Sequence, residues 1–241
     1  ILGTGTVGGF LKVVAPDDVT LQNSANDMGT LAASVTVTGK FFKYTDANNI
    51  EVGTVPTLGS LTAPSGISAS QTSLSGITTV GGTTGLILVS TVNGSITVTQ
   101  NIEVQTSSAT ISLDANRAAP EPGGATADID INATVRSVSG TVDVFADNSV
   151  RFNATGAIRS TSGNVTVRGD ADGNGTGAVT MTFGSVINAG SGKINIRADD
   201  DVTLAMVRSS NATISPDAIV VTSDSESIRD DGTETSFVQA P

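Results

Sequence analysis

The stretch "SGTVDVFADNSVRFNATGAIRSTSGNVTVRGDADGNGTGAVTMTFGSVINAGSGKINIRADDDVTLAMV", residues 139–207, decides the fold. It repeats the pattern Ser-Gly-x-Φ-x-Φ, in which Φ is aliphatic, at the three glycines Gly140, Gly163 and Gly192. After each glycine, short runs of alternating apolar and polar residues are separated by Gly, Asn, Asp and Ser. Alternation with a period of two predicts β-strands, and the residues between the runs favour turns.

The repeated units differ in length at one place only. Val144 to Val150 spans six residues in the first unit, whereas Val167 to Val179 spans twelve in the second. The apolar positions after this point agree again. The whole difference therefore lies in the decapeptide "RGDADGNGTG", residues 168–177, which we interpret as an insertion at a corner.

Three short strands per repeat predict an all-β fold, a right-handed parallel β-helix in which each coil completes its core with its neighbours. The inward positions are aliphatic in all three units (Val142, Val165, Ile194), and the outward positions between them are polar (Asp143, Thr166, Asn195). The pattern continues less regularly upstream. Residues 56–85 and 116–128 are irregular or rich in loop-forming residues. We expect one β-helical segment over 1–241, part of a longer repetitive protein or filament.

The amino-acid composition supports this fold and excludes several classes of chemistry and partner. The 241 residues are 38% hydrophobic but only 3% aromatic, so the core must consist of small aliphatic side chains. The chain has no cysteine and no histidine and a net charge of −11. We therefore expect no thiol or imidazole chemistry and no nucleic-acid partner. No stretch of the sequence approaches the ~20 apolar residues that span a bilayer, so we also expect no insertion into membranes.

Several runs resemble the β-strand repeats of very large bacterial surface proteins of the filamentous-haemagglutinin type. They are "DDVTLQNSANDMGTLAA" from Asp17, "FKYTDANNIEVGTV" from Phe42, "GAIRSTSGNVTV" from Gly156 and "ADDDVTLA" from Ala198. The resemblance implies a β-helical shaft that is exported to the cell surface or beyond and acts in adhesion. The secretion domain and membrane-anchoring region of that family are not recognisable in this sequence.

The inserted decapeptide carries three alternative interpretations. Asp170, Asp172 and Asn174 supply alternating oxygen ligands for Ca²⁺, although no glutamate closes the loop. "RGD" at Arg168 matches an adhesion tripeptide, but Arg168 aligns with the last outward residue of a strand. The third interpretation is a plain turn, because Asp, Gly and Asn are the residues that turns prefer. Of the three, the turn is the commonest use of such residues, and no other cofactor is expected.

Other acidic corners and sequons have similar alternatives. If Asp147 and Asp200 occupy equivalent corners, their like charges disfavour ionisation or invite a cation, whereas such residues more often cap their own turns. Six Asn-x-Ser/Thr sequons would be glycosylated only if the source glycosylates: Asn93, Asn132, Asn153, Asn164, Asn174 and Asn211.

These observations favour a structural and adhesive shaft of an extracellular bacterial surface or filament protein that associates end to end. Its expected partners are further copies of itself, adjacent repeats or surface glycans. The alternative is a carbohydrate-binding or polysaccharide-degrading β-helix. We expect no enzyme, because the outward row Asp143, Thr166 and Asn195 does not pair carboxylates with a basic residue.

Overall fold

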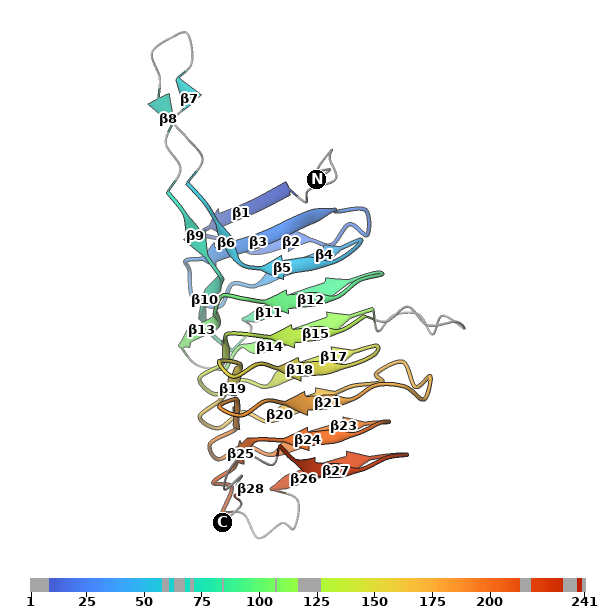
Figure 1. The fold of residues 1–241 in the computed structure, drawn as a ribbon. Helices are drawn as coiled ribbons and strands as arrows, with labels where there is room; N and C mark the ends of the chain where they lie inside the picture. Colours follow the sequence, from blue (N-terminus) through green and yellow to red (C-terminus); the bar gives the residue numbers. More distant parts are fainter. Residues whose placement is uncertain are drawn as a thin grey trace.

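The computed structural model describes residues 9–57, 61–62, 68–69, 72–83, 85–106, 108–116, 127–212, 218–231 and 238–239. The regular secondary structure in these residues consists of β-strands alone, which form an elongated stack of coils (Figure 1). Two long sheets contain only parallel pairs between strands of successive coils. The fold is thus a parallel β-solenoid with three strands per coil, as the repeat predicts.

The strands form three faces, which the chain visits in turn. The first face is one eight-stranded sheet: β2 (Val19–Leu21), β4 (Phe42–Asp46), β11 (Leu86–Thr91), β14 (Thr110–Ala115), β17 (Val142–Ala146), β20 (Val165–Arg168), β23 (Ile194–Ala198) and β26 (Ile219–Ser223).

The second face lies in front in Figure 1: β5 (Ile50–Val52), β12 (Ile96–Val98), β15 (Ile129–Ile131), β18 (Val150–Phe152), β21 (Val179–Met181), β24 (Val202–Leu204) and β27 (Ile228–Asp230). The third face contains β10 (Ile77–Gly81), β13 (Ile102–Thr106), β16 (Thr134–Arg136), β19 (Ala157–Arg159), β22 (Val186–Asn188), β25 (Met206–Arg208) and β28 (Val238–Gln239).

The long strand β3 (Met28–Val35) joins the second and third faces into one sheet, because it pairs with β5 through its first half and with β10 through its second. Strand β1 (Gly9–Ala15) covers β3 at one end of the stack. Between β5 and β10 the chain leaves the stack in two antiparallel pairs, β6 (Thr54–Val55) with β9 (Leu74–Ser75) and β7 (Leu61–Thr62) with β8 (Ser68–Ala69). Figure 1 shows this arm projecting beyond β1.

The core follows the register that the sequence alignment predicts. Val144 pairs with Val167 and Val167 with Ile196, and all three are buried. The outward row Asp143, Thr166 and Asn195 is also in register. Identical inward positions in successive coils therefore build one continuous aliphatic core along the stack.

The repeated glycines are explained by close packing between coils. A Cβ atom on Gly163 would lie 1.9 Å from the backbone oxygen of Gly140, and one on Gly192 would lie 2.1 Å from that of Gly163. Only a residue without a side chain fits at this corner.

The sequence predicts that segments 56–85 and 116–128 are irregular, and the structure tests this for the first segment much more than for the second. Strand β10 falls inside 56–85 and is a regular member of the third face, since it pairs in parallel with β3 and β13. Most of 116–128 lies outside the described residues.

Candidate functional site

The inserted decapeptide lies at the corner between the first and second faces, which we call the acidic corner. It connects β20 to β21, where the turns of neighbouring coils contain Asp147 and Asp199 to Asp201. This corner holds the residues that the sequence singles out for calcium binding.

The start of the loop still belongs to the solenoid. Arg168 is the last residue of β20 and pairs with Phe145 and Arg197 of the adjacent coils. The backbone N–H of Gly169 donates to the carbonyl oxygen of Arg197 at 3.0 Å. Asp170 is only 6% exposed. The Arg-Gly-Asp tripeptide is therefore held against the stack and is not displayed at a loop tip.

The three candidate calcium ligands accept hydrogen bonds from their own loop. Asp170 Oδ1 accepts from the N–H of Gly175 at 3.2 Å, and Asp172 Oδ1 accepts from that of Asn174 at 3.3 Å. Asn174 Oδ1 accepts from the N–H and the hydroxyl of Thr176, at 3.0 and 2.6 Å. These are the contacts of turns. A Ca²⁺ site formed by these residues stays a prediction.

Side chains that bind metals do not cluster here in the required way. Within the residues that the structure describes, no group of three or more Asp, Glu, His or Cys side chains is arranged to hold a metal ion.

Asp147, one coil before the loop, has an unusual environment. It is 2% exposed; Oδ2 accepts a hydrogen bond from Asn116 Nδ2 at 3.4 Å, and Oδ1 has no hydrogen-bond partner among the described residues. Burial, together with the adjacent carboxyl group of Asp172, raises the pKa of Asp147 to about 6. Burial also raises the pKa of Asp170.

The acidic neighbour of Asp147 differs from the one that the sequence suggests. The carboxyl group next to Asp147 is that of Asp172, because the insertion folds back over the preceding coil. Asp200 instead accepts a hydrogen bond from the N–H of Gly177 at 3.0 Å, in the coil next to its own. The aligned corners are thus not equivalent once six extra residues enter one of them.

We expect this carboxyl pair to make stability depend on pH. Because the pKa of Asp147 is higher in the folded than in the unfolded chain, its stabilising effect is present below about pH 4 and is lost as pH rises through 6. Asp147→Asn should raise the free energy of unfolding at pH 7 by roughly 1–3 kcal/mol and change it little at pH 4. Urea unfolding at both pH values checks this, and an equal effect of the substitution at the two would contradict it.

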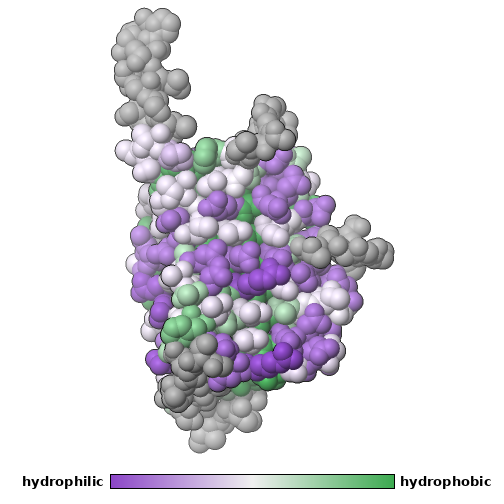
Figure 2. Space-filling view, in the orientation of Figure 1, coloured by the Kyte–Doolittle hydropathy of each residue, from purple (hydrophilic) through white to green (hydrophobic). Residues whose placement is uncertain are grey.

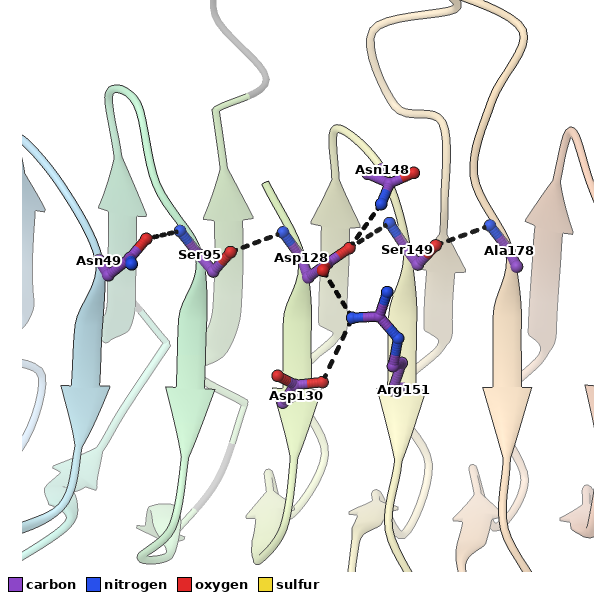
Figure 3. Close-up of polar contacts among 8 residues, drawn as sticks. All are labelled: Asn49, Ser95, Asp128, Asp130, Asn148, Ser149, Arg151 and Ala178. Carbon is purple, nitrogen blue, oxygen red and sulfur yellow. Dashed lines mark hydrogen bonds and ion pairs between the residues drawn. The ribbon is translucent and has the colours of Figure 1, made fainter. Parts of the chain in front are cut away.

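A row of side chains at the acidic corner links successive coils, and we call it the corner ladder (Figure 3). Each member precedes a second-face strand and accepts a hydrogen bond from the backbone N–H of the next member. Asn49 accepts from Ser95 at 2.7 Å, Ser95 from Asp128 at 2.9 Å, Asp128 from Ser149 at 3.0 Å, and Ser149 from Ala178 at 3.1 Å. The ladder satisfies amide groups at the turn, where the sheet ends.

Asp128 has the most contacts in the ladder. Its carboxylate also accepts from Asn148 Nδ2 at 2.8 Å and lies 2.6 Å from Arg151, which is 3.7 Å from Asp130 as well. Figure 3 shows Arg151 between the two carboxylates. These polar contacts bind two coils together.

Ala178 interrupts the corner ladder, since its side chain has no acceptor for the following coil. Ala178→Ser should raise the free energy of unfolding, and Ser149→Ala should lower it, each by about 1 kcal/mol, because one amide hydrogen bond is gained or lost. Urea unfolding of both variants checks this. Shifts of the same sign would contradict the ladder.

The sequons lie at different depths. Asn93, Asn153, Asn164 and Asn174 are exposed, and Asn132 is half-buried. Asn211 is only 9% exposed, so it is the least accessible of the six. Asn153 donates a hydrogen bond to Asn132 in the preceding coil, which gives both a structural role.

Comparison with protein-family models, with curated proteins and with solved structures finds no match to this chain. The described residues form no helix that is long and apolar enough to cross a membrane. The functional proposal therefore depends on the fold and on the chemistry of the surface.

Proposed function

We propose that the chain is a structural and adhesive shaft of an extracellular bacterial surface or filament protein, and that it associates end to end. The observation that supports this most is the continuity of the two parallel sheets and of the aliphatic core over the stack. Each coil inside the stack hydrogen-bonds to the coils on both sides, so the stack resists bending and local unfolding. The resemblance of the repeats to filamentous-haemagglutinin shafts suggests the location.

The end strands supply the contact for association. Within the described part of the chain, β1 and β2 pair on one side only, as do β26 and β27 at the other end. Phe10 and Val14 on β1 are 52% and 61% exposed, and Ile228 on β27 is 52% exposed. Figure 2 shows hydrophilic residues over most of the second-face side, with hydrophobic patches that include the two ends. Unpaired edges with apolar side chains favour pairing with another chain.

A head-to-tail arrangement suits these edges. All pairs in both long sheets are parallel, so β26 and β27 of one copy would continue the sheets that begin at β2 and β1 of the next. Such a heterologous contact repeats without closing and produces a filament.

Three aromatic residues lie close together in the sequence, Phe41, Phe42 and Tyr44. Phe41 is half-buried with the Lys43 ammonium group 4.5 Å from its ring centre, and Phe42 and Tyr44 are fully buried in the core. Phe42 and Tyr44 therefore cannot offer a flat exposed platform to a sugar ring.

Sedimentation velocity tests end-to-end association. Val14→Lys and Ile228→Lys place a charge on each end edge and should each reduce the share of assemblies larger than one chain. Val92→Lys changes an exposed residue in the turn between β11 and β12, away from the ends, and should leave assembly unchanged. A protein that is monomeric at every concentration, or equal behaviour of the three variants, would contradict the proposal.

A further inference from the structure

Four strands of the third face together have basic but no acidic residues, although the chain as a whole is acidic. On β16, β19, β22 and β25 the outward residues after the buried position form one row in register: Arg136, Arg159, Asn188 and Arg208. We call it the arginine row. No acidic residue occurs on these strands or in the adjoining segments 132–141, 153–164, 182–193 and 205–212, although the chain has 23 acidic and only 12 basic residues.

The cations of the arginine row are incompletely neutralised. Arg136 pairs with Glu103 of the preceding coil at 2.7 Å. Arg159 and Arg208 are exposed, and neither has an ion pair with a carboxylate among the described residues. Arg136 also lies directly opposite Arg159, an arrangement of like charges that is unfavourable unless an anion lies between them.

The spacing of the row suits a linear ligand. Neighbouring strands lie about 4.8 Å apart, so Arg136 and Arg159 are separated by one such step and Arg159 and Arg208 by two, about 10 Å. The row therefore runs straight along the axis of the shaft. A chain with anionic groups at regular intervals can pair with several guanidinium groups at once, and arginine binds carboxylate and sulfate groups through paired donors.

The surroundings of the row fit a sugar chain. A second row in register lies beside it, formed by Thr134, Ala157, Val186 and Met206; Ala157 is buried, and the apolar side chains of Val186 and Met206 are partly exposed. Phe183, in the turn that leads into β22, is 48% exposed. An apolar strip beside a polar one matches a pyranose, which has an apolar face and a rim of hydroxyl groups. A single-stranded nucleic acid fits this surface less well, because stacking of successive bases requires several exposed aromatic rings along the binding surface.

We propose that the arginine row binds a linear acidic glycan with carboxylate or sulfate groups, which lies along the third face parallel to the shaft. This assignment rests on the adhesive part of the proposed function and gives it a ligand class. It does not depend on association at the ends of the stack.

Binding of the full chain to polygalacturonate and to heparin, with dextran and single-stranded DNA as further probes, tests the proposal. The double variant Arg159→Ser with Arg208→Ser should weaken binding to the two acidic glycans at least tenfold. It should also reduce the magnitude of the negative slope of log binding constant against log salt concentration by about two. Lys43→Ser with Arg229→Ser removes the same charge from the first and second faces and should change binding less than twofold. Asn188→Arg fills the gap in the row and should strengthen binding.

The outcomes separate the alternatives. Equal loss in the two double variants would show a response to net charge only and would overturn the site. Binding of DNA as tight as that of heparin would overturn the assignment to a glycan, as would equal binding of dextran. Preference between polygalacturonate and heparin identifies the carboxylate or the sulfate as the recognised group. Because Ile228 lies on β27 of the second face, Ile228→Lys leaves the third face intact and should retain glycan binding even if end-to-end association fails.

Discussion

Gly163→Ala should lower the free energy of unfolding by about 3 kcal/mol, a large effect for the addition of a single methyl group. The new Cβ would lie 1.9 Å from the backbone oxygen of Gly140, so one coil must move away from the other. Overpacking of this kind typically costs about 1–3 kcal/mol, and here the obstacle is rigid backbone that belongs to a sheet.

Two control variants separate packing from backbone conformation. Gly173 in the inserted loop has nothing within 4 Å of its Cβ position but has a φ of 77°, so Gly173→Ala should cost only about 1 kcal/mol. Ser162→Ala changes an exposed neighbour of Gly163 and should be nearly neutral. Urea unfolding of the three variants provides the comparison. If Gly163→Ala costs no more than Gly173→Ala, the close contact between coils is wrong.

Ile111→Ala should lower the free energy of unfolding by about 3 kcal/mol, since it removes a fully buried side chain from the middle of the core. Ile111 stacks between Ile87 and Val142 of the neighbouring coils, so the cavity is lined on both sides. Such a cavity collapses poorly in a stack whose coils are fixed by two sheets.

The matched variant is Ile219→Ala, in the last first-face strand. Ile219 stacks on Ile194 on one side only among the described residues and is partly buried. Its loss should cost about 1 kcal/mol. Chemical unfolding followed by circular dichroism checks both values. Equal costs would contradict a core that is built by stacking of successive coils.

Much of the fold could be predicted from the sequence, because a solenoid repeats its constraints. The Ser-Gly anchor and the alternating aliphatic residues set the register of β17, β20 and β23 without any long-range information. The irregular segment 56–85 was harder, since β10 completes its coil only after the excursion of the arm.

Less of the candidate site could be predicted. The sequence places Asp170, Asp172 and Asn174 on one loop, but whether their oxygens turn toward a cation or toward loop amides depends on backbone angles such as the φ of 56° at Asp170. The contact between Asp172 and Asp147 depends on the path of the inserted loop, which cannot be inferred by aligning the repeats because the other units have no equivalent residues.

The corner ladder and the arginine row left a signal in the sequence that becomes visible only with the register. A polar residue precedes most of the second-face strands, and arginine recurs after the buried residue of third-face strands. Because the coils differ in length, these positions are not equally spaced along the chain. A search at a fixed period therefore misses them.

Electron microscopy of the purified full chain tests the central claim, that the chain is a stiff shaft which associates end to end, most directly. We predict straight rods of constant width whose lengths are multiples of one unit and increase with protein concentration. Val14→Lys should shorten the rods to single units. Single compact particles at all concentrations, or flexible assemblies of variable width, would contradict the claim.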